Sequence, residues 1–128
     1  MPGIKMYSKK VIQHFQNPKN MGKMNHPDSI GEAGNSQCGD TMKIYLKIED
    51  GKIKDISFET MGCVSAIATS SMITELAKGK TLAEAEKITY QDVVNELGQL
   101  PPVKIHCAGM AVEALKKAIE NCEKNKGK

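Results

Sequence analysis

Apolar and polar residues alternate along two neighbouring stretches in the middle of the chain. In the first stretch the apolar side chains stand at every second position, at Met42, Ile44, Leu46 and Ile48. The second stretch repeats the alternation at Ile56 and Phe58. An alternation with a period of two predicts β-strands that bury one face, and the Asp50-Gly51 pair between the stretches predicts a hairpin.

The register of this hairpin depends on the length of its loop. A two-residue loop would pair Ile44 with Ser57 and turn Ile56 to the wrong face. A three-residue loop over residues 49–51, with Gly51 in the left-handed conformation, pairs Ile44 with Ile56 instead. Because this second register keeps the apolar side chains on one face, we expect the three-residue loop.

The first third of the chain predicts one short helix followed by a long loop. Ser8 is a preferred N-cap residue, and apolar side chains follow it at helical spacing, at Val11, Ile12 and Phe15. Asn17-Pro18 ends this helix, and residues 18–37 are rich in Gly, Asn, Pro and Asp. We expect a loop there, with one short edge strand near Ile30.

Helical periodicity dominates the second half of the chain. The predicted helices span about residues 65–78, a short segment after Thr81, residues 91–97 and, beyond Pro101-Pro102, residues 107–123. The last helix has an apolar face formed by Met110, Ala111, Ala114, Leu115, Ala118 and Ile119. The order of elements predicts an α+β fold, in which a small antiparallel sheet of about three strands is covered on one face by helices.

Length and composition indicate a single domain over residues 1–128, with residues 1–6 and 124–128 expected to be flexible. The net charge is only +3, and all 18 basic residues are Lys. Because Arg is preferred for bidentate contacts to phosphates and bases, nucleic acid is not an expected partner. No apolar run approaches the roughly 20 residues of a membrane span, and we find no signal segment. We therefore expect no membrane partner and a cytoplasmic location.

A cytoplasmic protein keeps its thiols reduced, which makes the four cysteines candidate ligands, nucleophiles or core residues. Cys38 ends the predicted loop, and Cys63 and Cys107 stand at predicted helix starts. The positive end of a helix dipole favours a thiolate, so both are suited to bind a metal. Each position is also compatible with a turn residue or a small buried hydrophobe. Cys122, in the last helical turn, is interpreted as incidental.

Two of these cysteines have a second ligand-type residue beside them. Asp40 follows Cys38 by two positions, and His106 directly precedes Cys107. No C-x-x-C pattern occurs, which argues against thioredoxin and zinc-finger proteins. Three thiolates with Asp40 or His106 suit either zinc or an iron–sulfur cluster. A cysteine-nucleophile enzyme is not favoured, because adjacency at a helix start does not aim an imidazole at a thiol.

Several longer segments closely resemble the IscU proteins and the N-terminal domain of NifU, which are scaffolds of iron–sulfur cluster assembly. The resemblance covers about residues 7–121 and is carried by Tyr7-Ser8 through Asn17-Pro18-Lys19-Asn20, by Cys38-Gly39-Asp40, by Gly62-Cys63-Val64-Ser65 through Ser71, and by Leu100-Pro101-Pro102-Val103-Lys104-Ile105-His106-Cys107. It implies an IscU/SufE-like fold. It also implies transient binding of a 2Fe–2S or 4Fe–4S cluster, which is built on the protein and passed to apo iron–sulfur acceptor proteins.

The resemblance also implies roles for individual residues. Cys38, Cys63 and Cys107 would be the cluster thiolates, and Asp40 and His106 alternative or additional ligands. Asp40 would make the site labile, as a protein that releases its cluster requires. Cys107 would accept persulfide sulfur from a cysteine desulfurase of the IscS or NifS type, so the chain would be a carrier and not an enzyme.

Further partners and one alternative follow from the same resemblance. Residues 100–104 look like the motif by which such scaffolds engage a specialised Hsp70 chaperone and its J-type co-chaperone. A SufU-like zinc-binding sulfur-transfer protein would use the same ligands, but the long insertion between Cys63 and Cys107 that marks that branch is absent. Three thiolates leave one ligand of a 2Fe–2S cluster open. Asp40, His106 or a second subunit would supply this fourth ligand, so the sequence is also compatible with a homo-oligomer.

Overall fold

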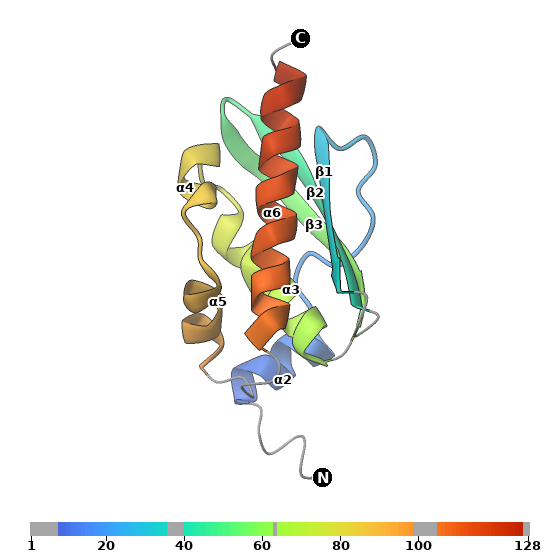
Figure 1. Ribbon diagram of the computed structural model, residues 1–128, viewed down its shortest axis with the longest axis vertical. Coiled ribbons are helices and arrows are strands. Elements are labelled where there is room, and N and C mark those ends of the chain that lie inside the picture. The colour runs from blue at the N-terminus through green and yellow to red at the C-terminus, as the bar shows by residue number, and fades with distance from the viewer. Residues whose placement is uncertain (1–7, 36–39, 63, 99–104, 127–128) are drawn as a thin grey trace.

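The computed structural model describes residues 8–35, 40–62, 64–98 and 105–126, whose arrangement Figure 1 shows. The strands are β1 (Ser29–Asn35), β2 (Asp40–Glu49) and β3 (Lys52–Met61). The helices are α2 (Lys9–Gln16), α3 (Val64–Ala77), α4 (Leu82–Glu86), α5 (Tyr90–Leu97) and α6 (Ile105–Lys126). Within this part of the chain, none of the helices has the length and apolar character needed to cross a lipid bilayer.

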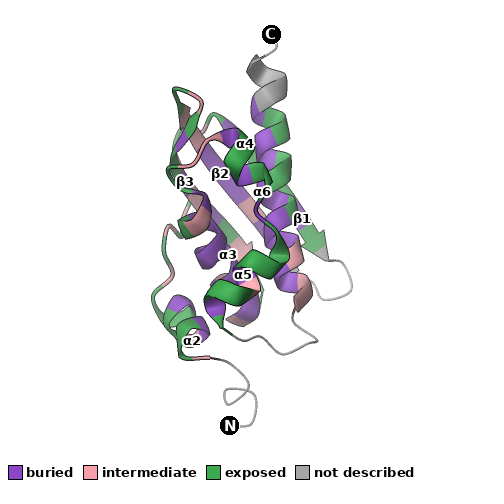
Figure 2. Cartoon of the chain, turned by 90° about the vertical axis from the view of Figure 1, so that its left-hand side faces the viewer, coloured by how far each residue is buried: buried purple, intermediate pink, exposed green. Residues whose placement is uncertain are grey.

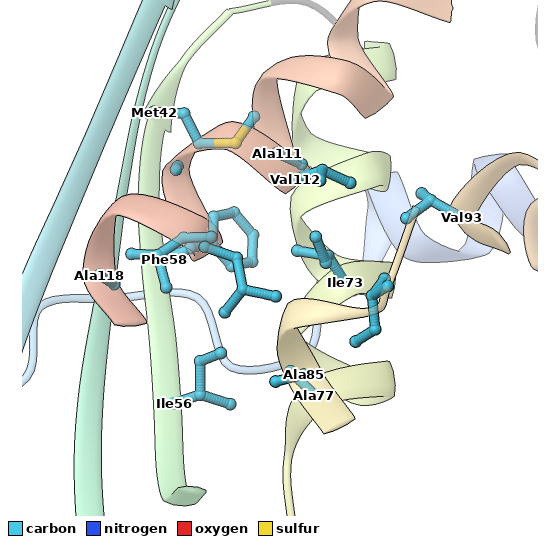
Figure 3. Packing of buried hydrophobic residues seen from close by; sticks show 14 of the residues in the cluster. Met42, Ile56, Phe58, Ile73, Ala77, Ala85, Val93, Ala111, Val112 and Ala118 are labelled. Carbon is cyan, nitrogen blue, oxygen red and sulfur yellow. The ribbon is translucent and has the colours of Figure 1, made fainter. Parts of the chain in front are cut away.

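The three strands form one antiparallel sheet in the order β1-β2-β3. Its inner face carries the alternating apolar side chains, and these are buried: Met42, Ile44, Leu46, Ile56 and Phe58. Helices α3 and α6 pack against this face, and Figure 3 shows side chains from the strands and the helices pointing into one shared core. The predicted α+β fold, a three-stranded sheet covered on one face by helices, is confirmed.

The hairpin between β2 and β3 has a different register from the expected one. Ile44 pairs with Phe58, so the predicted pairing of Ile44 with Ile56 is wrong. Asp50 and Gly51 have φ values of 56° and 75°, and they form a two-residue loop. Two consecutive residues with positive φ produce the turn whose twist matches that of the flanking strands, which explains why the shorter loop is preferred.

A β-bulge compensates for the two-residue loop, which by itself would turn the apolar side chains of β3 away from the core. Next to the turn, Ile48 pairs with Ile53, but one step further Lys47 pairs with Asp55. Lys54 is therefore an extra residue in β3, and it shifts the register by one position. Because a shift of one residue exchanges the two faces of a strand, the bulge returns the apolar side chains of β3 to the core.

The edge strand expected near Ile30 is present as β1, and α6 lies directly on it. A Cβ atom placed on Gly31 would be 2.1 Å from the carbonyl oxygen of Ala114 and 2.3 Å from the amide nitrogen of Ala118. The Ser29 hydroxyl donates to the carbonyl oxygen of Ala118 over 2.7 Å. The glycine thus allows strand and helix backbones to touch, which places α6 along the edge of the sheet.

Helix boundaries follow the predicted caps closely. Ser8 caps α2, where its hydroxyl accepts a hydrogen bond from the Val11 amide over 3.1 Å. Thr81 caps α4 in a reciprocal arrangement with Glu84. The last helix, α6, begins two residues before the predicted start, so Cys107 is its third residue. It ends at Lys126 and so continues into the segment that we expected to be a flexible tail.

Helix α3 is buried on nearly all sides, and Figure 2 shows how few of its residues reach the surface. Apart from the exposed Glu75, its polar residues are hydroxyl side chains that are completely buried: Ser65, Thr69, Ser70, Ser71 and Thr74. Three of them donate to carbonyl oxygens three or four residues earlier in the same helix. Such bonds satisfy the hydroxyls without solvent, which lets a Ser- and Thr-rich helix occupy the middle of the molecule.

Candidate functional site

His106 and Cys107 lie in the first turn of α6. Cys107 is fully buried, and its Sγ atom is 3.7 Å from Nε2 of the partly exposed His106. A thiol and an imidazole at this distance are close enough to bind the same metal ion, and both are ligands of soft metals. The helix N-terminus favours negative charge on the sulfur. The structure therefore brings this predicted pair together, and the expectation that adjacency at a helix start would not aim the imidazole at the thiol is wrong.

The strand ends next to the other predicted ligands also meet. β2 begins at Asp40 and β3 ends at Met61, and Thr41 pairs with Met61 across the two strands. Helix α3 begins only three residues after Met61, at Val64. The chain on both sides of position 63 therefore lies at the same end of the sheet as the backbone of Asp40.

Contacts between α3 and α6 connect this end of the sheet with Cys107. The buried hydroxyl of Thr69 lies 2.7 Å from the carbonyl oxygen of Ser65 and 3.4 Å from that of Cys107. The early turns of the two helices are consequently adjacent, and in Figure 1 the lower end of α6 lies beside α3. The start of β2, the start of α3 and the start of α6 converge at one end of the molecule.

Other predicted site residues lie outside the described residues, namely Cys38, Cys63 and Leu100, Pro101, Pro102, Val103 and Lys104. Asp40 is placed by its backbone alone. Among the residues that the structure describes, no group of three or more His, Cys, Asp or Glu side chains is arranged to hold a metal ion. The full ligand set therefore stays a prediction from the sequence.

An open hollow of about 670 Å³ borders this end of the sheet. Its lining includes Thr41 and the largely exposed Met61, together with the ion pair of Glu32 and Lys43, whose charged atoms are 3.3 Å apart. Glu59 lines it too and accepts a hydrogen bond from the hydroxyl of buried Tyr45. Burial, reinforced by the Glu59 carboxylate, raises the pKa of Tyr45 to about 12, which keeps this donor protonated.

A second polar cluster, which sequence inspection does not single out, fastens α2 to α3. Nδ1 of His14 lies 2.7 Å from the Ser71 hydroxyl, which also accepts the Lys19 amide over 2.8 Å. Burial lowers the pKa of His14, and the Glu75 carboxylate, 3.9 Å from Nε2, opposes this shift. The only sequence signal is the run of hydroxyl residues in an otherwise apolar helix.

Cys122 occupies a different environment from Cys107. It is buried among the apolar side chains of the main core, near the opposite end of α6. This position suits a small hydrophobic side chain and agrees with the prediction that Cys122 stands apart from the candidate ligands.

Comparison with known proteins identifies the family. The family model of the NifU-like N terminal domain matches residues 6–128. The chain belongs to this family. The IscU 1 iron-sulfur cluster assembly scaffold protein of Archaeoglobus fulgidus is 54% identical over 123 residues, which cover 96% of this chain and 80% of the relative. The IscU scaffold protein of Azotobacter vinelandii is 47% identical over 125 residues, covering 94% and 97% of the two chains.

Solved structures of two other proteins share the fold. A structure described as a putative iron-sulfur cluster assembly scaffold protein for the SUF system, from Fervidobacterium islandicum, superposes with a TM-score of 0.75 at 23% identity, covering 90% of this chain and 97% of that one. The N-terminal part of a NifU-like protein from Brucella abortus gives a TM-score of 0.74 at 23% identity, covering 93% and 95%. The predicted resemblance to NifU and IscU proteins is thus confirmed for both sequence and fold.

Proposed function

We propose that this NifU-like domain is a scaffold on which an iron–sulfur cluster is assembled and from which the cluster is transferred to apo-proteins. The observation that carries the proposal is the convergence of the Cys107–His106 pair with the start of β2 and the chain flanking Cys63. The relatives named as cluster assembly scaffolds align over nearly the whole chain, which supports the same conclusion. The expected cargo is a 2Fe–2S cluster, with 4Fe–4S as the other form.

The proposed ligands are the three thiolates of Cys38, Cys63 and Cys107. Soft sulfur ligands are the usual protein ligands of iron–sulfur clusters. The fourth ligand of a 2Fe–2S cluster would come from Asp40, from His106 or from a second copy of the chain. His106 is well placed for this role because its Nε2 atom already lies beside the Cys107 sulfur.

Sulfur would enter at Cys107 from a cysteine desulfurase. The Cys107 thiolate attacks the outer sulfur of the donor's persulfide, the S–S bond of the donor breaks, and the donor cysteine leaves as a thiolate. The persulfide moves to Cys107 with no net oxidation or reduction. Since Cys107 is fully buried, a local opening around the thiol has to precede the attack.

The proposal also includes a chaperone-binding segment and a reducing cellular location. Residues 100–104, which precede α6, would bind an Hsp70-type chaperone and its J-type partner. A reducing cytoplasm would keep the three thiols available. Both follow from the sequence resemblance, and the cluster experiment does not depend on either.

Anaerobic reconstitution tests the scaffold function. The zinc-free protein is incubated with ferrous iron, cysteine and a cysteine desulfurase, and its visible spectrum is followed. We expect iron–sulfur charge-transfer bands that decay when an apo-ferredoxin is added and gains the cluster. Cys38→Ser, Cys63→Ser and Cys107→Ser should each weaken the bands strongly. Cys122→Ala, which changes a cysteine in the apolar core, is the matched control and should leave them intact.

A different outcome would favour zinc-dependent sulfur transfer. The same donor set suits tetrahedral zinc, so metal content after purification does not separate the two functions. Absence of bands in the wild type, with zinc bound and sulfur still accepted at Cys107, would contradict the scaffold proposal. Bands of equal intensity in all three Ser variants would contradict the proposed ligands.

A further inference from the structure

Thr69 connects α3 to the backbone of Cys107. The side chain is fully buried, and its hydroxyl oxygen lies 2.7 Å from the carbonyl oxygen of Ser65, 3.2 Å from that of Ala66 and 3.4 Å from that of Cys107. The first two carbonyls belong to α3 and the third to α6. The hydroxyl therefore lies at the contact between the two helices, at the level of the first turn of α6.

The neighbouring hydroxyls of α3 make different contacts. Ser70 is equally buried, but its hydroxyl donates to the carbonyl oxygen of Ala66, 2.8 Å away in the same helix. Ser71 faces His14 and the Lys19 amide, on the side of α2. The contact with Cys107 is thus specific to the position of Thr69 on the helix and is not a general consequence of hydroxyl residues in α3.

We propose that Thr69 is a positioning residue for Cys107, whose hydroxyl holds the first turn of α6 against α3 and so limits how often the thiol becomes accessible. The inference rests on the proposed function, in which Cys107 accepts sulfur. Because the thiol is fully buried, any reagent or sulfur donor reaches it only after local opening. The single hydroxyl proton is shared between the Ser65 carbonyl at 2.7 Å and the Cys107 carbonyl at 3.4 Å, so the branch to Cys107 is the weaker one. Because this branch breaks during the opening, it makes the open state rarer.

Alkylation of the native apo-protein at constant pH measures the opening directly. Iodoacetamide is added, and the modification of each cysteine is followed by peptide mass spectrometry. Cys122 is the internal reference, since it is buried near the other end of the same helix and reports opening of the core. The variants are Thr69→Val, which keeps the shape but removes the hydroxyl, Thr69→Ser, which keeps the hydroxyl, and Ser70→Ala as the matched control.

Thr69→Val is expected to raise the alkylation rate of Cys107 about twofold, the factor that corresponds to about 0.5 kcal/mol at the low end for one hydrogen bond, and to leave the rate of Cys122 unchanged. Thr69→Ser should restore the wild-type rate, and Ser70→Ala should not accelerate Cys107. An equal acceleration of Cys107 and Cys122 would overturn the proposal, because it would show general destabilisation. An unchanged Cys107 rate in Thr69→Val would overturn it as well.

The alkylation experiment requires no iron, sulfide or desulfurase, so it is independent of cluster reconstitution. Selective acceleration of Cys107 supports the positioning role whatever the cluster experiment gives. Failure of reconstitution with this selectivity intact would overturn the scaffold proposal alone.

Discussion

At the residue scale, surroundings rather than residue type decide what the two histidines near helix ends do. His14 is enclosed between α2 and α3, where a serine hydroxyl contacts one ring nitrogen. His106 is partly exposed and directs its Nε2 atom to a thiol. Burial disfavours the charged imidazolium at the first position. His14 is therefore a structural residue, whereas His106 is available as a ligand.

The lowered pKa of His14 makes stability depend on pH in a defined direction. Below the ordinary histidine pKa of about 6.5, the unfolded chain takes up a proton at His14 that the folded protein resists. The stabilisation is therefore fully present above pH 6.5 and is lost as the pH falls below that value. Urea unfolding at pH 7.5 and 5.5 should show a larger loss of stability for the wild type than for His14→Gln.

His26→Asn is the control for this measurement. His26 is exposed and has a φ of 56°, a conformation that asparagine tolerates. Its substitution should leave the difference between the two pH values as in the wild type. If His14→Gln behaved like His26→Asn, the assignment of the pH dependence to His14 would be wrong.

Asp40 differs from the other proposed ligands because it would bind the cluster through a carboxylate. A carboxylate oxygen is a poorer match than a thiolate for the soft site of an iron–sulfur cluster, so Asp40 would be the ligand that exchanges most easily. We expect Asp40→Ala to slow transfer of a reconstituted cluster to apo-ferredoxin several-fold. Glu120→Ala, at an exposed carboxylate of α6, should not change the transfer rate. Unchanged transfer in Asp40→Ala would count against Asp40 as the labile ligand.

At the element scale, the contact between β1 and α6 has little tolerance because it joins two backbones. The atoms nearest to Gly31 are a carbonyl oxygen and an amide nitrogen of a continuous helix, which cannot rotate away as a side chain would. Any added side chain has to push α6 off the edge of the sheet. Since α6 also carries His106 and Cys107, this contact helps to place the candidate site.

Gly31→Ala should therefore be strongly destabilising. We expect a loss of about 3 kcal/mol or more, at or beyond the upper end for overpacked cores. Gly109→Ala is the matched control, because Gly109 lies within α6 and a Cβ there would meet no atom within 4 Å. That variant should be neutral or gain up to about 1 kcal/mol from helix propensity. Similar stabilities of the two variants in urea unfolding would contradict the close approach.

At the scale of the whole molecule, the candidate site is assembled from elements that are distant in the sequence. Asp40 starts a strand, Val64 starts the helix that follows the next strand, and Ile105 starts the final helix. Binding at such a site connects the sheet with both helices. A metal that binds only the native arrangement should therefore stabilise the entire fold.

Zinc provides a simple probe of this linkage. At a free zinc concentration one hundred times its dissociation constant, binding adds about 2.7 kcal/mol. For a domain of this size, this corresponds to a rise of roughly 10 °C in the melting temperature. Differential scanning calorimetry should show the rise in the wild type and in Cys122→Ala, and most of it should vanish in Cys107→Ser. An equal rise in Cys107→Ser would place zinc elsewhere.

Sequence alone determined the elements and the types of candidate residue. The alternation at Met42 to Ile48 and the cap at Ser8 are local signals, and strand and helix formation respond to local signals. The position of Cys107 at a helix start follows in the same way. Cys38, Asp40 and Cys63 are candidate ligands from their positions at predicted element ends, and the resemblance to a known family joins them into one predicted site.

Tertiary structure decided which distant residues meet. The bulge at Lys54 corrected the register, because the turn prefers two residues while the core requires the apolar face of β3. Thr69 reaches Cys107 across 38 positions, and His14 reaches Ser71 across 57. No local pattern encodes such pairs, because they arise only when helices and sheet pack to exclude water and bring distant polar groups within hydrogen-bond distance.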